Sequence, residues 1–220
     1  MLRYRNIIRR FVIKHVASLL IVLGVLGLIL SIGHHVRAPA VSNPTSIKVS
    51  AAPSSVKLTQ KSINNYSVPS DDPKYIAVPS IGITNTPIVR LGLLAGGAIS
   101  TPDNIYEAGW YEGSALPGQS GATFIYGHVS SWTADGIFYN LKKLVAGNMI
   151  TLTRGDGKTF RYRVISSRVY ASNDVDMRTV LSPINSKLPG LNLMTCTGTV
   201  IPGTSEFTER LVVFTSLIRG

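Results

Sequence analysis

The chain has 220 residues, 45% of them apolar, which is enough for one domain with a buried core and an additional tail. Its formal net charge of +11 would suit a nucleic-acid-binding protein if the charge were spread over a folded surface. All 11 acidic residues lie from Asp71 onward, where 13 Lys and Arg residues leave a net charge of only +2, so we expect no nucleic-acid partner.

The first 33 residues have the pattern of a membrane anchor. A basic tail, residues 1–15, precedes an uncharged apolar segment, residues 16–33, which is close to the roughly 20 residues needed to cross about 30 Å of hydrocarbon. Five cations lie before this segment and only Arg37 lies shortly after it, so the positive-inside rule predicts a single-pass protein of the cell membrane with a cytoplasmic N-terminus. The alternative is a cleaved signal peptide ending near Ala38-Pro39-Ala40, and both interpretations place the following domain outside the membrane.

Residues 34–70 are rich in Ala, Ser, Pro, Thr, Asn and Lys, and they contain few large apolar side chains and no acid. Such a composition buries too little apolar surface to order a chain by itself. We therefore predict a flexible extracellular linker, with an additional N-terminal strand around residues 46–58 as the alternative.

Residues 71–220 are predicted to form an all-β domain, because short apolar runs alternate with clusters of Gly, Pro, Asn and Asp. The clearest element is a hairpin in which residues 148–154 and 158–170 flank the turn sequence Gly155-Asp156-Gly157. The other predicted strands cover residues 75–78, 87–91, 122–126, 191–195 and 210–217, and short helices are predicted near residues 138–144 and 175–181.

Two residues with reactive side chains follow strand ends in this domain. Cys196 is the one cysteine of the chain, which rules out an intrachain disulfide and a zinc site with several thiolates. His128 is the one histidine that lies away from the membrane segment. An imidazole near a thiol, whose ordinary pKa is about 8.5, increases the reactivity of that thiol. Taken separately, each residue also fits a structural role, as a buried cysteine and a hydrogen-bonded histidine.

These residues carry a family resemblance. Leu193-Met194-Thr195-Cys196 resembles the Leu-x-Thr-Cys signature of sortases, Gly127-His128 resembles their catalytic histidine after a strand, and Arg210 opens a strand as their essential arginine does. The order His, Cys, Arg agrees with the family, and the resemblance extends over residues 74–217. It includes three further segments, residues 109–111, 117–121 and 138–141.

The resemblance implies an eight-stranded β-barrel and a cysteine transpeptidase that cleaves an LPxTG-like sorting signal between Thr and Gly. Cys196 would be the nucleophile, His128 the general acid and base, and Arg210 the group that stabilises the substrate or its oxyanion. The expected partners are surface proteins that carry this signal and an amine of a peptidoglycan precursor or a pilin. The basic anchor is more similar to housekeeping or single-substrate sortases, such as those of classes D, E and F, than to the pilin-polymerising type.

Substrate contacts are expected from Thr195 and from the segment before Cys196, where Leu181, Ile184 and Leu188 are candidates for an apolar pocket. Packing in the core is the alternative role for these three residues. No cofactor is expected. Some sortases use calcium, but the acids before His128, chiefly Glu107 and Glu112, are too few to predict such a site.

Other classes of protein are less consistent with the order of these residues. An L,D-transpeptidase places its cysteine a few residues after a histidine, and a papain-like peptidase places its cysteine first, whereas His128 precedes Cys196 by 68 positions. The remaining alternative is a non-catalytic, membrane-anchored β-domain that binds cell-wall components. The reactivity of the thiol distinguishes it from an enzyme.

Overall fold

The computed structural model describes residues 46–47 and 52–219. The predicted basic tail and membrane anchor, and residues 34–45 and 48–51 of the predicted linker, lie outside these ranges. Every helix within the described ranges is too short or too polar to cross a bilayer.

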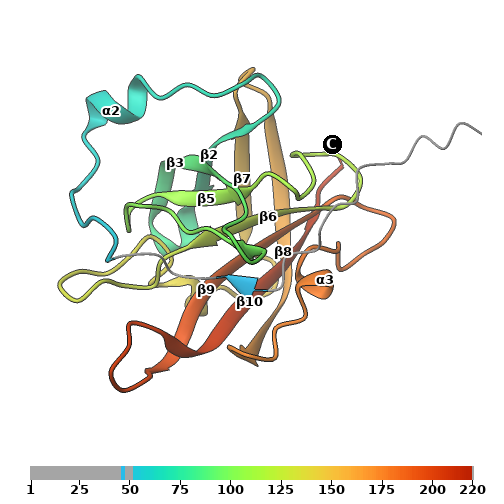
Figure 1. The fold of residues 1–220 in the computed structure, drawn as a ribbon. Coiled ribbons are helices and arrows are strands. Elements are labelled where there is room, and N and C mark those ends of the chain that lie inside the picture. The colour runs from blue at the N-terminus through green and yellow to red at the C-terminus, as the bar shows by residue number, and fades with distance from the viewer. Residues whose placement is uncertain (1–45, 48–51, 220) are drawn as a thin grey trace, which may run out of the picture. The chain divides into compact units, whose positions relative to one another are not determined.

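Within the described ranges, eight strands close into one β-barrel (Figure 1). Around the barrel they follow the order β10-β8-β7-β2-β3-β5-β6-β9, with parallel pairing of β3 to β5 and of β6 to β9 and antiparallel pairing elsewhere. The barrel strands are β2 (Pro73–Val78), β3 (Ile83–Leu91), β5 (Ala108–Tyr111), β6 (Ala122–Gly127), β7 (Met149–Arg154), β8 (Thr159–Ala171), β9 (Gly190–Val200) and β10 (Phe207–Leu217).

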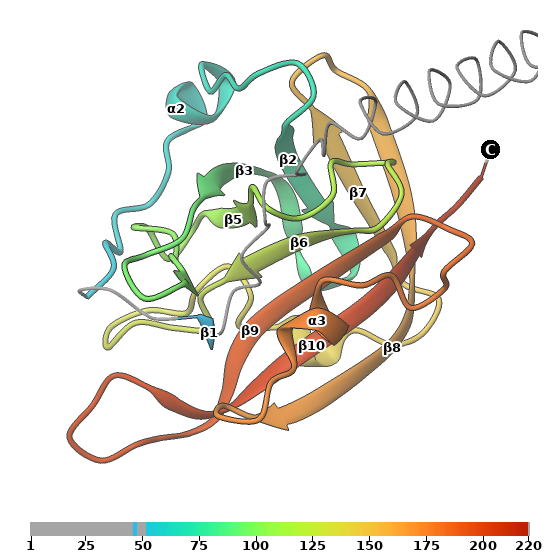
Figure 2. The ribbon, with the colours of Figure 1, turned by 45° about the vertical axis from the view of Figure 1, so that its right-hand side comes forward.

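The remaining elements are short. Two helical turns, η1 (Pro79–Ile81) and η2 (Leu141–Lys143), connect barrel strands, and α3 (Met177–Val180) lies over β9 and β10 (Figure 2). A parallel pair is formed by β1 (Ser46–Ile47) and β4 (Ala98–Ile99). The described part of the predicted linker contains α2 (Gln60–Asn64), followed by Tyr66, whose hydroxyl donates to the carbonyl of Ile88 at 2.6 Å. Whether this segment is flexible stays a prediction.

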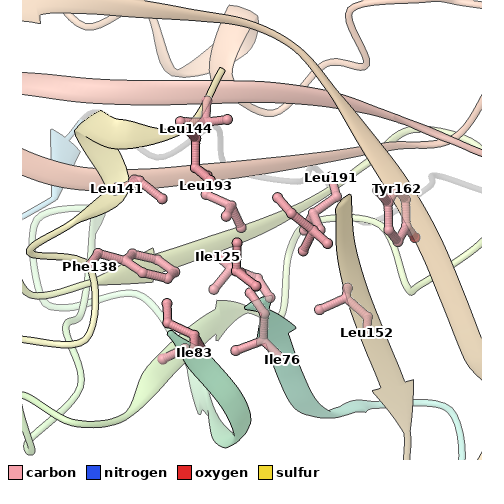
Figure 3. Close-up of a cluster of buried hydrophobic side chains, with 14 of the residues drawn as sticks. Ile76, Ile83, Ile125, Phe138, Leu141, Leu144, Leu152, Tyr162, Leu191 and Leu193 are labelled. Carbon is pink, nitrogen blue, oxygen red and sulfur yellow. The ribbon is translucent and has the colours of Figure 1, made fainter. Parts of the chain in front are cut away.

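Strand alternation explains the two hydrophobic clusters. On β9, Leu191 and Leu193 belong to a core cluster that also draws residues from β2, β7 and β8 (Figure 3), whereas Met194 and Cys196 belong to a second cluster with Met177 of α3. Successive side chains of a strand point to opposite faces, so β9 is covered on both. The same alternation occurs on β6 and β10, which places one face of all three strands under α3.

The predicted hairpin is confirmed. β7 and β8 pair in antiparallel register, and Gly157 in their turn adopts a φ of +84°, a conformation that glycine permits. Tyr162 and Val164 are buried while Arg161 and Arg163 between and beside them are exposed, as the alternation predicted. β5 is a strand that the sequence analysis did not predict, because Ala108–Tyr111 is short and buried throughout and therefore lacks an alternating pattern.

Candidate active site

Cys196 lies near the end of the buried part of β9. Its side chain is buried on the face covered by α3, and β6 and β10 flank the strand on its two sides. The residue before it, Thr195, points to the other face, where its hydroxyl donates to the carbonyl of Gly127 at 2.7 Å. This hydrogen bond joins the strand that carries the cysteine to the end of the strand that precedes His128.

His128 follows the last residue of β6 and is also buried. A Cβ at Gly127 would lie 2.5 Å from the ring of Phe138, so only glycine allows the chain to approach this closely before the histidine. The Nε2 atom of His128 lies 2.8 Å from the carbonyl oxygen of Pro102. A carbonyl only accepts, so Nε2 carries the hydrogen and Nδ1 of the neutral ring is left as the acceptor.

Burial is also the main influence on the charge of His128. Removal from solvent lowers the pKa of the imidazole, against a smaller opposing effect from its hydrogen bond to Pro102. The neutral form therefore predominates at neutral pH, and the imidazolium, when it forms, is a stronger acid than an exposed one.

Arg210 stands directly opposite Cys196 in the register of β9 and β10. Residues paired in this way have Cβ atoms roughly 4.5–5.5 Å apart on the same face of the sheet. The guanidinium is buried, and its Nη1 donates to the carbonyls of Phe207 at 2.8 Å and Glu209 at 3.0 Å. Within the described ranges, Nε and Nη2 have no hydrogen-bond acceptor, so these nitrogens are available to a bound group.

Cys196 and His128 line the same cavity, which has a volume of about 280 Å³. Arg210 lines a neighbouring cavity of about 80 Å³ together with Met177 and Met194. The other residues of the larger cavity come from β6, from the segment after His128, from the ends of β9 and β10 and the loop between them, and from the chain before α2. They are Tyr126, Val129, Ser130, Ser131, Trp132, Val200, Ser205, Phe207, Ala52 and Pro53.

Tyr126 is a site residue that the sequence analysis missed. Its hydroxyl lies 3.2 Å from the sulfur of Cys196, and its ring meets the ring of His128 edge to face, with centroids 5.8 Å apart. The one available signal was position, because Tyr126 stands two residues before His128. The surrounding run Phe124-Ile125-Tyr126 nevertheless has the pattern of an ordinary buried strand.

The predicted substrate-contact residues are more dispersed. Thr195 is buried and bonded within the barrel wall, and Leu181 packs partly buried against the cluster that contains Cys196. Ile184 lines a third cavity, of about 260 Å³, which shares no lining residue with the cavity of Cys196. Leu188 is half-buried and lines none of the three cavities. Their role toward a substrate stays a prediction.

No cluster of three or more His, Cys, Asp or Glu side chains suited to a metal ion occurs among residues 46–47 and 52–219. The chemistry that the described side chains offer is that of a thiol, an imidazole and a guanidinium, which together suit covalent acyl transfer.

Comparison with known families identifies the chain. The family model for the sortase domain matches residues 76–218. The chain belongs to the sortase family. Sortases are cysteine transpeptidases, and Cys196, His128 and Arg210 all lie within the matched region.

Solved structures agree with this assignment. Sortase C2 of pilus island 1 from Group B Streptococcus is 25% identical, with a TM-score of 0.53 over 81% of this chain and 88% of that one. Sortase C of Streptococcus pneumoniae (24% identity, TM-score 0.52, 79% and 82% coverage) and a lid mutant of sortase A from Corynebacterium diphtheriae (24%, 0.52, 71% and 74%) share the fold. A search of curated proteins found no match.

Proposed function

We propose that this sortase cleaves an LPxTG-like sorting signal between Thr and Gly and transfers the new carboxyl end to an amine. The observation that carries the proposal is that Cys196 and His128 line one cavity while Arg210 faces Cys196 across the β9–β10 pair. No other cysteine exists in the chain to serve as the nucleophile.

In the first step, the site reacts in the form in which the proton of the Cys196 thiol has moved to His128, and the resulting thiolate bonds to the carbonyl carbon of Thr in the sorting signal. The Thr–Gly C–N bond breaks, and the imidazolium of His128 gives its proton to the departing Gly amine. Burial lowers the pKa of His128, which makes this proton easier to release. The substrate then remains attached to the enzyme as a thioester.

In the second step, an amine attacks the thioester carbon and gives a proton to His128 as the C–S bond breaks, which restores the thiolate. The candidate acceptors are an amine of a peptidoglycan precursor and a lysine of a pilin. Arg210 is permanently charged and can donate hydrogen bonds from Nε and Nη2 to the substrate oxygen that becomes negative in both steps.

The proposed location is the outer face of the cell membrane, with the N-terminal segment as the anchor. The charge distribution supports this orientation, because five cations precede the apolar segment of residues 16–33. Surface proteins that carry the sorting signal would reach the enzyme on the same side.

A transfer assay tests the proposal. The full chain, purified in detergent, is mixed with a Leu-Pro-x-Thr-Gly peptide and either a glycine oligomer or a lysine peptide, and products are separated by mass. We expect a transfer product from the wild type and none from Cys196→Ala. Absence of both transfer and cleavage in the wild type, across Leu-Ala-x-Thr-Gly variants too, would favour a binding domain without activity.

A further inference from the structure

We propose that Tyr126 is a positioning residue of this active site, whose hydroxyl donates a hydrogen bond to the sulfur of Cys196 and stabilises it as the thiolate. The inference rests on the proposed function, because it assigns a role in preparing the same nucleophile. It concerns a residue outside the set of Cys196, His128 and Arg210.

The topology places Tyr126 beside the nucleophile. β6 pairs in parallel with β9, and Tyr126 is the Cα partner of Met194, two residues before Cys196 on the same face of β9. The hydroxyl thereby reaches the sulfur at 3.2 Å across 70 residues of sequence. Within the described part of the chain, this is the one hydrogen bond made by the sulfur and the one made by the hydroxyl.

The environment determines which group donates. Tyr126 is fully buried, and burial, followed by the adjacent Cys196, raises the pKa of its phenol well above the ordinary value of 10. The phenol therefore keeps its proton at any pH at which the enzyme works. A thiolate has no proton to give, so the hydroxyl is the donor whenever Cys196 is in its reactive form.

The same residue also contacts the proton-transfer group. The ring of Tyr126 meets the ring of His128 edge to face, and both residues line the same cavity. Phenylalanine at this position would keep this ring contact and remove only the hydroxyl. Tyr126→Phe therefore separates the hydrogen bond to sulfur from the packing of the site.

Among the described residues, three titratable or charged side chains lie near Cys196. Tyr126 lies on β6, His128 follows β6, and Arg210 lies opposite Cys196 on β10. The other nearby segments, which include Met177 of α3 and Ala52–Pro53, contribute no charge. Hydrogen bonds to charged groups are the stronger kind. Loss of the hydrogen bond from Tyr126 should therefore slow the alkylation of Cys196 at neutral pH.

The experiment is the pH dependence of alkylation of Cys196 by iodoacetamide in the full chain, with Tyr162→Phe as the matched control. Tyr162 is also fully buried, but its hydroxyl accepts from the backbone N–H of Gly118 at 3.1 Å and belongs to the cluster on the other face of the barrel strands. We expect the pH midpoint of alkylation to be higher in Tyr126→Phe than in the wild type. In Tyr162→Phe, we expect it to be unchanged. Transfer activity of Tyr126→Phe should fall at neutral pH, through kcat rather than KM.

A second variant should shift the pH midpoint of Cys196 alkylation in the opposite direction. Site-specific 3-fluorotyrosine at position 126 has a more acidic phenol, donates a stronger hydrogen bond, and should lower the alkylation midpoint below that of the wild type. Equal midpoints in the wild type, in a folded Tyr126→Phe and in the fluorinated protein would overturn the role of Tyr126 while leaving the proposed function intact. A wild-type Cys196 that resists alkylation at every pH would instead overturn both.

Discussion

At the scale of single residues, the site combines groups that are each buried and each held by a specific partner. The backbone carbonyl of Pro102 fixes the ring of His128, the carbonyls of Phe207 and Glu209 fix one nitrogen of Arg210, and the hydroxyl of Tyr126 reaches Cys196. Such contacts leave Nδ1 of the histidine and two guanidinium nitrogens for substrate. Preorganised donors of this kind stabilise developing charge without having to reorient during the reaction.

The buried histidine makes stability depend on pH. Its pKa is lowered in the folded state, mainly by burial, so the unfolded chain binds the proton more readily once the pH falls below about 6.5, the ordinary value for histidine. Acid therefore favours unfolding through this residue. We expect the melting temperature to fall more between pH 8 and pH 5.5 in the wild type than in His128→Gln.

Each kcal/mol by which acid destabilises the wild type more than His128→Gln would lower its melting temperature by about 2–4 °C in a chain of this size. Thermal melts followed by circular dichroism at both pH values provide the measurement. If the melting temperature falls equally in the two proteins between pH 8 and pH 5.5, His128 is not buried as described.

At the scale of elements, Asn192 connects a barrel strand to the segment before it. Its Nδ2 donates to the carbonyls of Val180 at 2.6 Å and Ser182 at 2.8 Å, which lie at the end of α3 and just beyond it. The residue is fully buried on β9, on the same face as Cys196. It therefore holds the α3 segment, where part of the substrate pocket was predicted, against the strand of the nucleophile.

Replacing Asn192 by alanine should loosen that segment. Two carbonyls would lose their donors, and an unsatisfied buried acceptor costs about 1–3 kcal/mol, so we expect a melting temperature lower by several degrees. We also expect KM for the sorting peptide to rise more than kcat falls. The control is Asn185→Ala, an exposed residue of the same segment whose side chain bonds only to the N–H of Lys187. Equal stability and equal KM in the two variants would contradict this role for Asn192.

The sequence was most informative where a strand has one exposed face. The β7–β8 hairpin was predicted because Phe160, Tyr162 and Val164 alternate with arginines and because glycines mark the turn. β5 lacks that alternation. His128 and Cys196 could be chosen as catalytic candidates because the domain contains one of each at strand ends.

The contacts of Tyr126 and Asn192 could not be predicted, since both depend on which distant segments become neighbours. Tyr126 meets Cys196 only because β6 pairs in parallel with β9, and Asn192 meets Val180 only because α3 folds over the same sheet face. In sequence, one is an aromatic residue and the other a polar residue, and each lies within an apolar run that is typical of a buried strand. The positions of Leu181, Ile184 and Leu188 depend equally on how the segment from Ser172 to Pro189 folds.

At the scale of the whole molecule, barrel closure is what assembles the site. His128 and Cys196 lie 68 positions apart, and the adjacency of β6, β9 and β10 in the closed barrel brings them to one cavity with Arg210 beside it. β9 is the central strand of these three (Figure 1). The proposed transfer reaction therefore requires Cys196 to act as a covalent nucleophile.

The most direct test is the intact mass of the protein after brief mixing with a Leu-Pro-x-Thr-Gly peptide in the absence of an acceptor amine. We expect an added mass equal to the Leu-Pro-x-Thr acyl group, located on Cys196 by peptide mapping, released by hydroxylamine, and absent from Cys196→Ala. Cleavage of the peptide by Cys196→Ala, or an adduct on another residue of the wild type, would contradict a covalent role for Cys196.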